Sequence, residues 1–140
     1  MRKYYLDIEK SKEVYDYFKD NIKVKECYNN IFNVFTLSPK TFRDGKWKIA
    51  YGYVEVMPLL YCRHCFILDE NDKIIDPTTF AQPEPQLNRE YYITTIFDNT
   101  DEYLSAIESD NLMPALDKYL KEQDKQAQQW AKNNGVLFIG

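Results

Sequence analysis

The 140-residue sequence has no apolar run that approaches the roughly 20 residues needed to span a bilayer. Residues 1–14 include basic side chains, but they contain neither an apolar signal core nor a cleavage site. We therefore expect a cytoplasmic protein that does not insert into a membrane.

Cysteine and histidine are scarce, with three Cys residues and one His. An odd number of cysteines cannot pair completely, and thiols in the cytoplasm are normally reduced. The cysteines are therefore expected to act as thiols or metal ligands rather than as disulfide partners.

Positive charge is not in excess, because 18 Lys and Arg residues face 22 Asp and Glu residues, and the net charge is −4. This balance argues against a nucleic-acid partner, which needs clustered basic side chains. Hydrophobic residues make up 44% of the chain and charged residues 29%, which is typical of a globular protein. Without repeats, low-complexity tracts or a Gly/Ser linker, residues 1–140 are expected to form a single domain.

The residue pattern predicts helices, then a run of antiparallel strands, then helices, which is an α+β layout. Hydrophobic spacing and capping residues define the helices, and β-branched and aromatic residues define the strands. The expected elements are a helix over 11–22 capped by Ser11, a helix over 27–37 stopped by Pro39, strands over 47–56, 59–68, 71–77 and 89–97, a helix from about Thr100 capped by Asn99, and a helix from about Pro114 to Gly135.

The strand over 59–68 carries the single histidine, His64. Side chains alternate along a strand, so one face presents Leu60, Cys62, His64, Phe66 and Leu68. A hairpin loop over 70–72, closed by Asp69 against Lys73, sets Phe66 opposite Asp76. His64 then lies one diagonal step from Asp76, about 7–8 Å away at Cα, within reach of an imidazole and a carboxylate.

Three residues have the chemistry that thiolate catalysis requires: a thiol, a base and a group that orients the base. Cys27 lies in the first turn of a predicted helix, where free N–H groups and the helix dipole favour a thiolate. His64 is the one imidazole available as the base. Asp76 can accept the other ring N–H, and Pro77 would fix its backbone.

The order Cys27, His64, Asp76, with "YGYVEV" upstream of "RHCFILDENDKIIDPT", resembles the transglutaminase-like branch of the papain-fold cysteine enzymes. The resemblance covers residues 26–80. It implies helices packed on a small antiparallel sheet, followed by C-terminal helices. It also implies that Cys27 is the nucleophile, His64 the general base and acid, and Asp76 the orienting carboxylate.

The reaction implied by this resemblance is acyl transfer from an amide or peptide carbonyl through a thioester. The substrate would be a protein or peptide, or a small amide, and no cofactor is required. Hydrolysis, deamidation and crosslinking all stay open. Tyr51 and Tyr53, with Trp47, are the candidate substrate-binding residues, and the Asn, Lys, Ile and Tyr usage suits an AT-rich bacterium or its phage.

Two other classes of protein stay open. No Gly precedes Cys27 and no Gln upstream offers an oxyanion donor, which would suit a non-catalytic protein-binding module with the same fold. The candidates for a second oxyanion donor are Asn29, Asn30, Trp47, Tyr51 and Tyr53. The "CRHC" stretch suggests a zinc module, but zinc needs four converging ligands, and a strand directs Cys62 and Cys65 to opposite faces.

Overall fold

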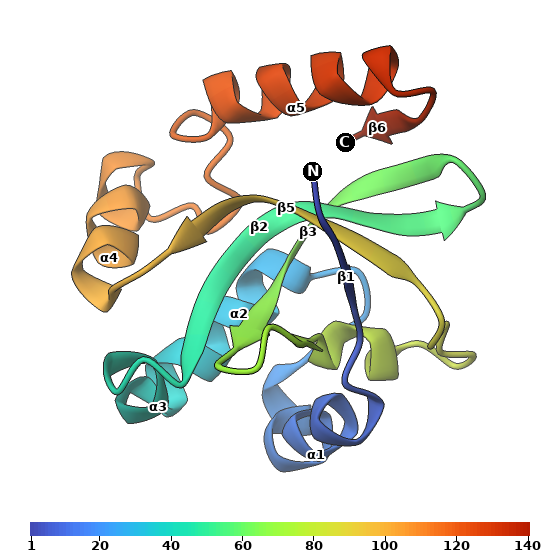
Figure 1. Cartoon of the computed structure of the whole chain (residues 1–140). Coiled ribbons are helices and arrows are strands. Elements are labelled where there is room, and N and C mark those ends of the chain that lie inside the picture. The colour runs from blue at the N-terminus through green and yellow to red at the C-terminus, as the bar shows by residue number, and fades with distance from the viewer.

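The computed structural model describes residues 1–140 and has an α+β architecture of five helices and a mixed six-stranded sheet (Figure 1). This confirms the predicted fold class at that level. The helices are α1 (Ile8–Phe18), α2 (Cys27–Leu37), α3 (Pro39–Arg43), α4 (Thr100–Ser109) and α5 (Lys121–Asn133), with short 3₁₀ turns η1 (Lys19–Asn21) and η2 (Pro77–Ala81). The strands are β1 (Lys3–Tyr5), β2 (Trp47–Met57), β3 (Leu60–Asp69), β4 (Ile74–Ile75), β5 (Glu90–Phe97) and β6 (Leu137–Ile139).

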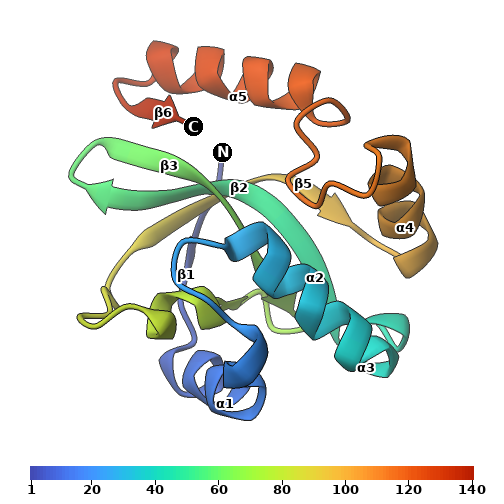
Figure 2. The same ribbon diagram turned by 180° about the vertical axis from the view of Figure 1, so that it is seen from behind.

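The sheet follows the order β1-β5-β2-β3-β4, and each neighbouring pair is antiparallel. In addition, β6 pairs with β3 in parallel, so the expectation of a purely antiparallel sheet was wrong. Both ribbon views show α5 on one side of the sheet and α1 and α2 on the other (Figures 1 and 2). None of the helices has the length and apolar character to cross a membrane.

The hydrophobic core is divided between the two faces of the central hairpin. One face of β2 and β3 packs against α1, α2 and α4, and a separate aromatic cluster joins the sheet to α5. The opposite face forms a smaller core made of Ala50, Val54, Phe66, Leu68, Ile74 and Tyr91. His64 precedes Phe66 by two residues on β3, so it shares the face of this smaller core.

The β2–β3 hairpin and the start of α2 were predicted closely. β4, however, is two residues long instead of filling residues 71–77. Its register with β3 pairs Ile67 with Ile75 and Leu68 with Ile74, which is the register expected from the loop. Pro77 has no N–H for a further ladder bond, and η2 begins there.

Two predicted helix starts were wrong. Helix α1 begins at Ile8, because the Asp7 side chain caps it by accepting the N–H of Lys10, while Ser11 is buried inside the first turns. Helix α5 begins at Lys121 instead of Pro114. The Asn99 cap of α4 is confirmed by its bond from the N–H of Glu102.

Gly52 lies where β2 and β5 approach closely. The register of this pair shifts between Tyr51 and Gly52, and a Cβ atom at Gly52 would lie 1.8 Å from the carbonyl oxygen of Tyr92. Only glycine tolerates that approach. Because Gly52 also pairs with His64 across the hairpin, this bulge sits directly beside the catalytic candidate.

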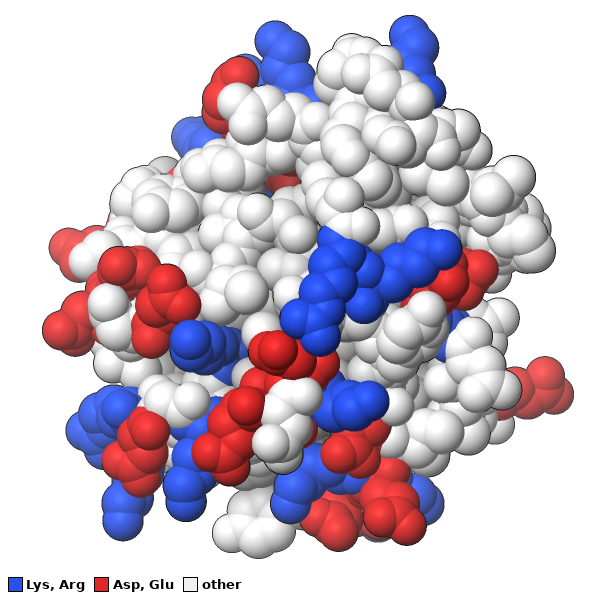
Figure 3. Space-filling view, in the orientation of Figure 1, with Lys and Arg blue, Asp and Glu red and all other residues white.

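Charged side chains of both signs are interspersed on the face of the molecule drawn in Figure 3, mostly over its lower half, and a short basic band across the middle has acidic side chains at both ends. This mixture matches the modest net charge of −4. The charge near the candidate site comes from individual ion pairs, such as His64 with Asp76 and Arg63 with Asp124.

Candidate active site

His64 and Asp76 are in direct contact. Nε2 of His64 lies 2.9 Å from Oδ2 of Asp76, and the side chains are 12% and 0% exposed. The contact follows from the β3–β4 register, which puts the two residues on one face, one diagonal step apart. The predicted proximity is confirmed, while the chemical roles of the two residues stay predictions.

Asp76 is held by several donors besides the imidazole. Its Oδ2 accepts the hydroxyl of Tyr91 at 2.7 Å and that of Thr79 at 3.0 Å, and it lies 3.6 Å from a guanidinium nitrogen of Arg89. Its backbone N–H donates to the Ser11 hydroxyl at 3.0 Å. Both the main chain and the side chain of Asp76 are thereby fixed in one position.

The two side chains form a buried ion pair. Burial raises the pKa of Asp76, but the positive charges of His64 and Arg89 and the hydrogen bonds lower that pKa below its usual value. For His64, burial lowers the pKa, but Asp76 and the Cys27 thiol raise it to about 10. The surroundings of the ring therefore favour the protonated imidazole.

Cys27 is the first residue of α2 and is 7% exposed. Cys27 is one of the groups that raise the pKa of His64, so the thiol belongs to the surroundings of the ring, although no hydrogen bond joins its sulfur to the imidazole. Since Nε2 is bound to Asp76, Nδ1 is the nitrogen left for the sulfur. The structure thus brings His64 and Asp76 into contact, and the contact of the Cys27 sulfur with the ring stays a prediction.

A gap in the edge of the sheet lies at His64. β6 pairs with β3 at residues 60–62, and β4 pairs at residues 67–68, so His64 lies between the two short strands. Helix α2 packs against β3, and Figure 2 shows it running beside the hairpin. The start of a helix, rather than a strand, therefore faces the edge that carries His64.

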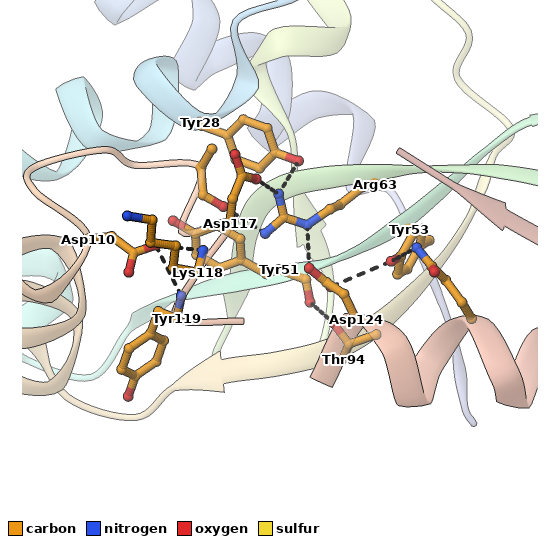
Figure 4. Close-up of polar contacts among 12 residues, drawn as sticks. Tyr28, Tyr51, Tyr53, Arg63, Thr94, Asp110, Asp117, Lys118, Tyr119 and Asp124 are labelled. Carbon is orange, nitrogen blue, oxygen red and sulfur yellow. Dashed lines mark hydrogen bonds and ion pairs between the residues drawn. The ribbon is translucent and has the colours of Figure 1, made fainter. Parts of the chain in front are cut away.

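A hydrogen-bond network ties the neighbours of Cys27 and His64 together (Figure 4). The Arg63 side chain is 5% exposed and donates to the Tyr28 hydroxyl at 3.2 Å, to Asp117 at 3.0 Å and to the carbonyl of Ala115 at 2.6 Å. Its Nε lies 2.8 Å from Asp124 on α5. Its guanidinium also stacks over the Tyr28 ring at 5.1 Å.

This network has a direct consequence for the thiol and the imidazole. Arg63 precedes His64 on β3, and Tyr28 follows Cys27 on α2. The contact between Arg63 and Tyr28 therefore fixes the distance between the backbone segments that carry the sulfur and the ring. Nothing in the residue pattern indicated this pairing, because Arg63 has the pattern of an ordinary exposed residue on a strand.

The predicted substrate-binding residues are packed against other parts of the protein. Tyr51 and Tyr53 are fully buried, and the Tyr51 hydroxyl donates to the carbonyl of Pro114. Trp47 is at the far end of β2, where it packs edge-on against Phe42. In this structure, none of the three rings walls a groove beside Cys27.

The two asparagines proposed as oxyanion donors have other partners. The Asn30 amide donates to the carbonyl of Lys23 at 2.7 Å and to Thr78 at 3.0 Å, and its oxygen accepts the N–H of Lys23. The exposed Asn29 amide donates to Glu26. Asn30 instead holds the loop before α2 against the turn that follows Asp76.

Thr79, Arg89 and Tyr91 were not predicted as members of the site. Thr79 follows Asp76 by three residues, a spacing at which a hydroxyl can reach back to a carboxylate. Arg89 and Tyr91 are two residues apart, so they share a face at the start of β5. That alternation was visible in the sequence, but nothing in the sequence indicated that the face meets Asp76.

The zinc alternative gains no support from the ligand geometry, because no group of three or more His, Cys, Asp or Glu residues is arranged to hold a metal ion. Cys65 is buried in the core beneath α2, whereas Cys62 is partly exposed. Comparisons of the chain with protein-family models, with curated proteins and with solved structures found no match.

Proposed function

We propose that the chain catalyses cysteine-dependent acyl transfer from an amide or peptide carbonyl, with Cys27 as nucleophile, His64 as general base and acid, and Asp76 as the orienting carboxylate. One observation carries the proposal. A fully buried carboxylate binds Nε2 of the single imidazole, and the cysteine at the first position of α2 is one of the groups that raise the pKa of that ring.

In this mechanism the Cys27 proton resides on His64, and the thiolate attacks the carbonyl carbon to form a C–S bond. The His64 ring then gives its proton to the departing amine as the C–N bond breaks, leaving a thioester. Water or a second amine attacks the thioester, His64 takes a proton from the attacking group, and the Cys27 sulfur departs. Asp76 keeps the ring oriented throughout.

The start of α2 offers donors for the oxyanion. The first N–H groups of a helix have no intrahelical acceptors, and Glu26 at the N-cap makes no side-chain bond to them. The backbone N–H of Cys27 is therefore available to a developing negative charge. A papain/transglutaminase-like fold is part of the same proposal, supported by a helix that begins at the cysteine and packs on the strand that carries the histidine.

Acylation with p-nitrophenyl acetate tests the proposal. We expect one acetyl group on Cys27, located by peptide mapping and mass spectrometry, with release of p-nitrophenol. The His64→Ala variant should lose this labelling, whereas Cys62→Ser should keep it. Labelling that is equally fast in His64→Ala, or that falls on Cys62, would exclude the proposed nucleophile.

A non-catalytic protein-binding module is the second candidate, and a specific observation favours it. Cys27 is 7% exposed, and the prominent surface pockets are lined by residues other than Cys27 and His64. A binding module would leave Cys27 unacylated in the same experiment while the fold stays intact.

A further inference from the structure

Two buried basic side chains share one carboxylate in the candidate site. Nε2 of His64 lies 2.9 Å from Oδ2 of Asp76, and a terminal guanidinium nitrogen of Arg89 lies 3.6 Å from the same oxygen. The Arg89 side chain is 10% exposed, and Asp76 is the one carboxylate with which it forms an ion pair. When His64 is protonated and Cys27 is neutral, the group therefore carries one positive charge in excess.

The shared oxygen brings the two basic groups close together. Because their nitrogens lie 2.9 Å and 3.6 Å from Oδ2, these nitrogens are separated by at most the sum of the two distances, 6.5 Å. A positive charge this near disfavours the charged form of a second cation, and salt screens buried charges only weakly. Arginine does not lose its proton in proteins, so the repulsion acts on the protonation of His64.

Thr79 connects Arg89 to Asp76 through hydrogen bonds. The guanidinium donates to the Thr79 hydroxyl at 2.7 Å, and this hydroxyl donates to Oδ2 of Asp76 at 3.0 Å. Because a guanidinium can only donate, the single hydrogen of the hydroxyl is directed to Asp76. Arg89 thus orders a donor to the carboxylate and also adds a positive charge beside it. Both effects weaken the attraction of Asp76 for the proton of His64.

Few other titratable groups contact the pair of His64 and Asp76. On β5, the Tyr91 hydroxyl donates to Asp76 at 2.7 Å, and burial and the charge of Asp76 raise the pKa of Tyr91 well above its usual value. Helix α1 contributes the neutral Ser11 hydroxyl, and Cys27 on α2 is one of the groups that raise the pKa of His64. Charged groups of the neighbouring strands have partners of their own: Arg63 with Asp117 and Asp124, Glu55 with the backbone N–H of Glu90, and Glu90 with Lys3.

The proposed reaction needs an imidazole that both accepts and releases a proton. Nε2 keeps its proton in the bond to Asp76, so the proton that moves is the one on Nδ1. Asp76 alone would hold the ring in its protonated form, because a carboxylate in contact stabilises the imidazolium. Hydrolysis of the thioester, however, requires a neutral ring that takes a proton from water. A second cation beside the carboxylate makes this neutral ring more accessible.

We propose that Arg89 is a positioning residue for this reaction, which shares the charge of Asp76 with His64 and thereby makes Nδ1 of the ring release its proton more readily. Arg89 acts through Asp76 and Thr79 rather than on the reacting atoms. Its role in catalysis rests on the proposed function, but its effect on the proton of His64 requires no chemistry at Cys27.

The test titrates the single imidazole by NMR in the Cys27→Ala protein, which cannot form a thioester. Arg89→Gln removes the charge and keeps an amide that can donate to Thr79. It should raise the pKa of His64 by about 1 or more, the size expected when a nearby like charge is lost. Arg89→Lys keeps the charge, so its pKa should lie closer to that of the parent. Arg43→Met, which removes an exposed charge on α3, should leave the pKa unchanged.

The pH dependence of hydrolysis gives a second readout, which a purely structural role of Arg89 would not move. In the protein with native Cys27, hydrolysis of acetyl-Cys27 reaches half of its maximum rate at a pH set by the base. Arg89→Gln should raise this pH by the same amount as it raises the pKa of His64.

An equal pKa of His64 in Arg89→Gln and in the parent would overturn the proposal. A rise of the same size in Arg89→Lys would overturn it too, because that variant keeps the charge. If the NMR spectrum shows that Arg89→Gln is unfolded, Arg89→Lys decides: a folded protein with the parental pKa supports the proposal. Loss of the fold in both variants would overturn it, since Arg89 would then be required for folding.

These outcomes are separate from failure of the proposed function. If Cys27 is never acylated but the pKa of His64 responds to Arg89, the charge relationship stands in a non-catalytic protein. If Cys27 is acylated by p-nitrophenyl acetate and the pKa of His64 does not respond to Arg89, acyl transfer stands without this role of Arg89.

Discussion

His64 donates through Nε2 to Oδ2 of Asp76 at 2.9 Å, across two strands joined by a short loop. The register of β3 and β4 alone decides this contact, because a slip of one residue would turn Asp76 to the other face. The same bond leaves Nδ1 for another partner, which in the proposed mechanism is Cys27.

Replacing Asp76 with Asn should remove the charge that balances His64 and weaken every donor bond to Oδ2. Breaking one side of a buried ion pair costs about 3 kcal/mol, and we expect a loss of that order in the free energy of unfolding. Urea denaturation measures it. Asp98→Asn, an exposed change, should stay within about 0.5 kcal/mol. A similar small effect for Asp76→Asn would contradict the ion pair.

The pKa of His64 can be measured directly, because the chain contains one histidine and its ring signals in NMR need no assignment. Burial lowers this pKa, but Asp76 and Cys27 raise it, and we expect a midpoint at about 10. In Cys27→Ala the pKa should fall, since one of the two raising groups is gone. An unchanged pKa of His64 in that variant would show that the thiol does not interact with the ring.

The raised pKa of His64 also makes stability depend on pH. A group whose pKa is higher in the folded state binds more protons there, so its contribution is fully present below the unfolded value of 6.5 and is lost as the pH rises through about 10. The difference in unfolding free energy between the unmodified protein and His64→Gln should therefore shrink across this range. A stability difference that grows with pH would contradict the raised pKa of His64.

Gly52→Ala should disrupt the bulge beside His64. The added Cβ would lie 1.8 Å from the carbonyl oxygen of Tyr92, and the backbone would have to move to remove this clash. We therefore expect the free energy of unfolding to fall by about 3 kcal/mol or more. Gly45→Ala is the matched control. It has a positive φ of 77° and open space around its Cβ, so it should cost about 1 kcal/mol. Equal losses in thermal or urea unfolding would rule out the close approach as the cause.

Lys25 adopts a left-handed backbone, with φ at 62°, two residues before Cys27. Left-handed backbone costs a residue with a Cβ about 1–2 kcal/mol, part of which glycine recovers. Lys25→Gly should therefore stabilise the protein by about 0.5–1 kcal/mol. Lys12→Gly, inside α1, should instead destabilise it by about 1 kcal/mol. Destabilisation by both changes would show that the Lys25 side chain matters more than its backbone.

Local patterns in the sequence were enough for the parts of the site that lie within one hairpin or one helix. The hairpin loop over residues 70–72 predicted the register of β3 with β4. The alternation of side chains in that register then predicted that His64 and Asp76 share a face. The helix that starts at Cys27 was predicted with both ends correct, because hydrophobic spacing and Pro39 mark it. These features depend on neighbours in the chain.

Features that depend on distant segments were missed. β1 and β6 are three-residue strands whose pairing with β5 and β3 has no local pattern. Turns replace the helix predicted from Pro114, because side chains of the sheet donate hydrogen bonds to backbone carbonyls of this segment. Tyr51 donates to the carbonyl of Pro114, and Arg63 donates to that of Ala115.

The alkylation rate of Cys27 by iodoacetamide at about pH 6 tests the proposed pairing of Cys27 with His64 most directly. A Cys62→Ser background removes the partly exposed thiol, and burial raises the pKa of Cys65 well above its usual value, so Cys65 stays unreactive. With His64 present, we predict an alkylation rate about tenfold or more above that of His64→Ala. Because Cys27 is equally buried in both proteins, its low exposure does not affect this ratio. Equal rates in the two proteins would contradict the account.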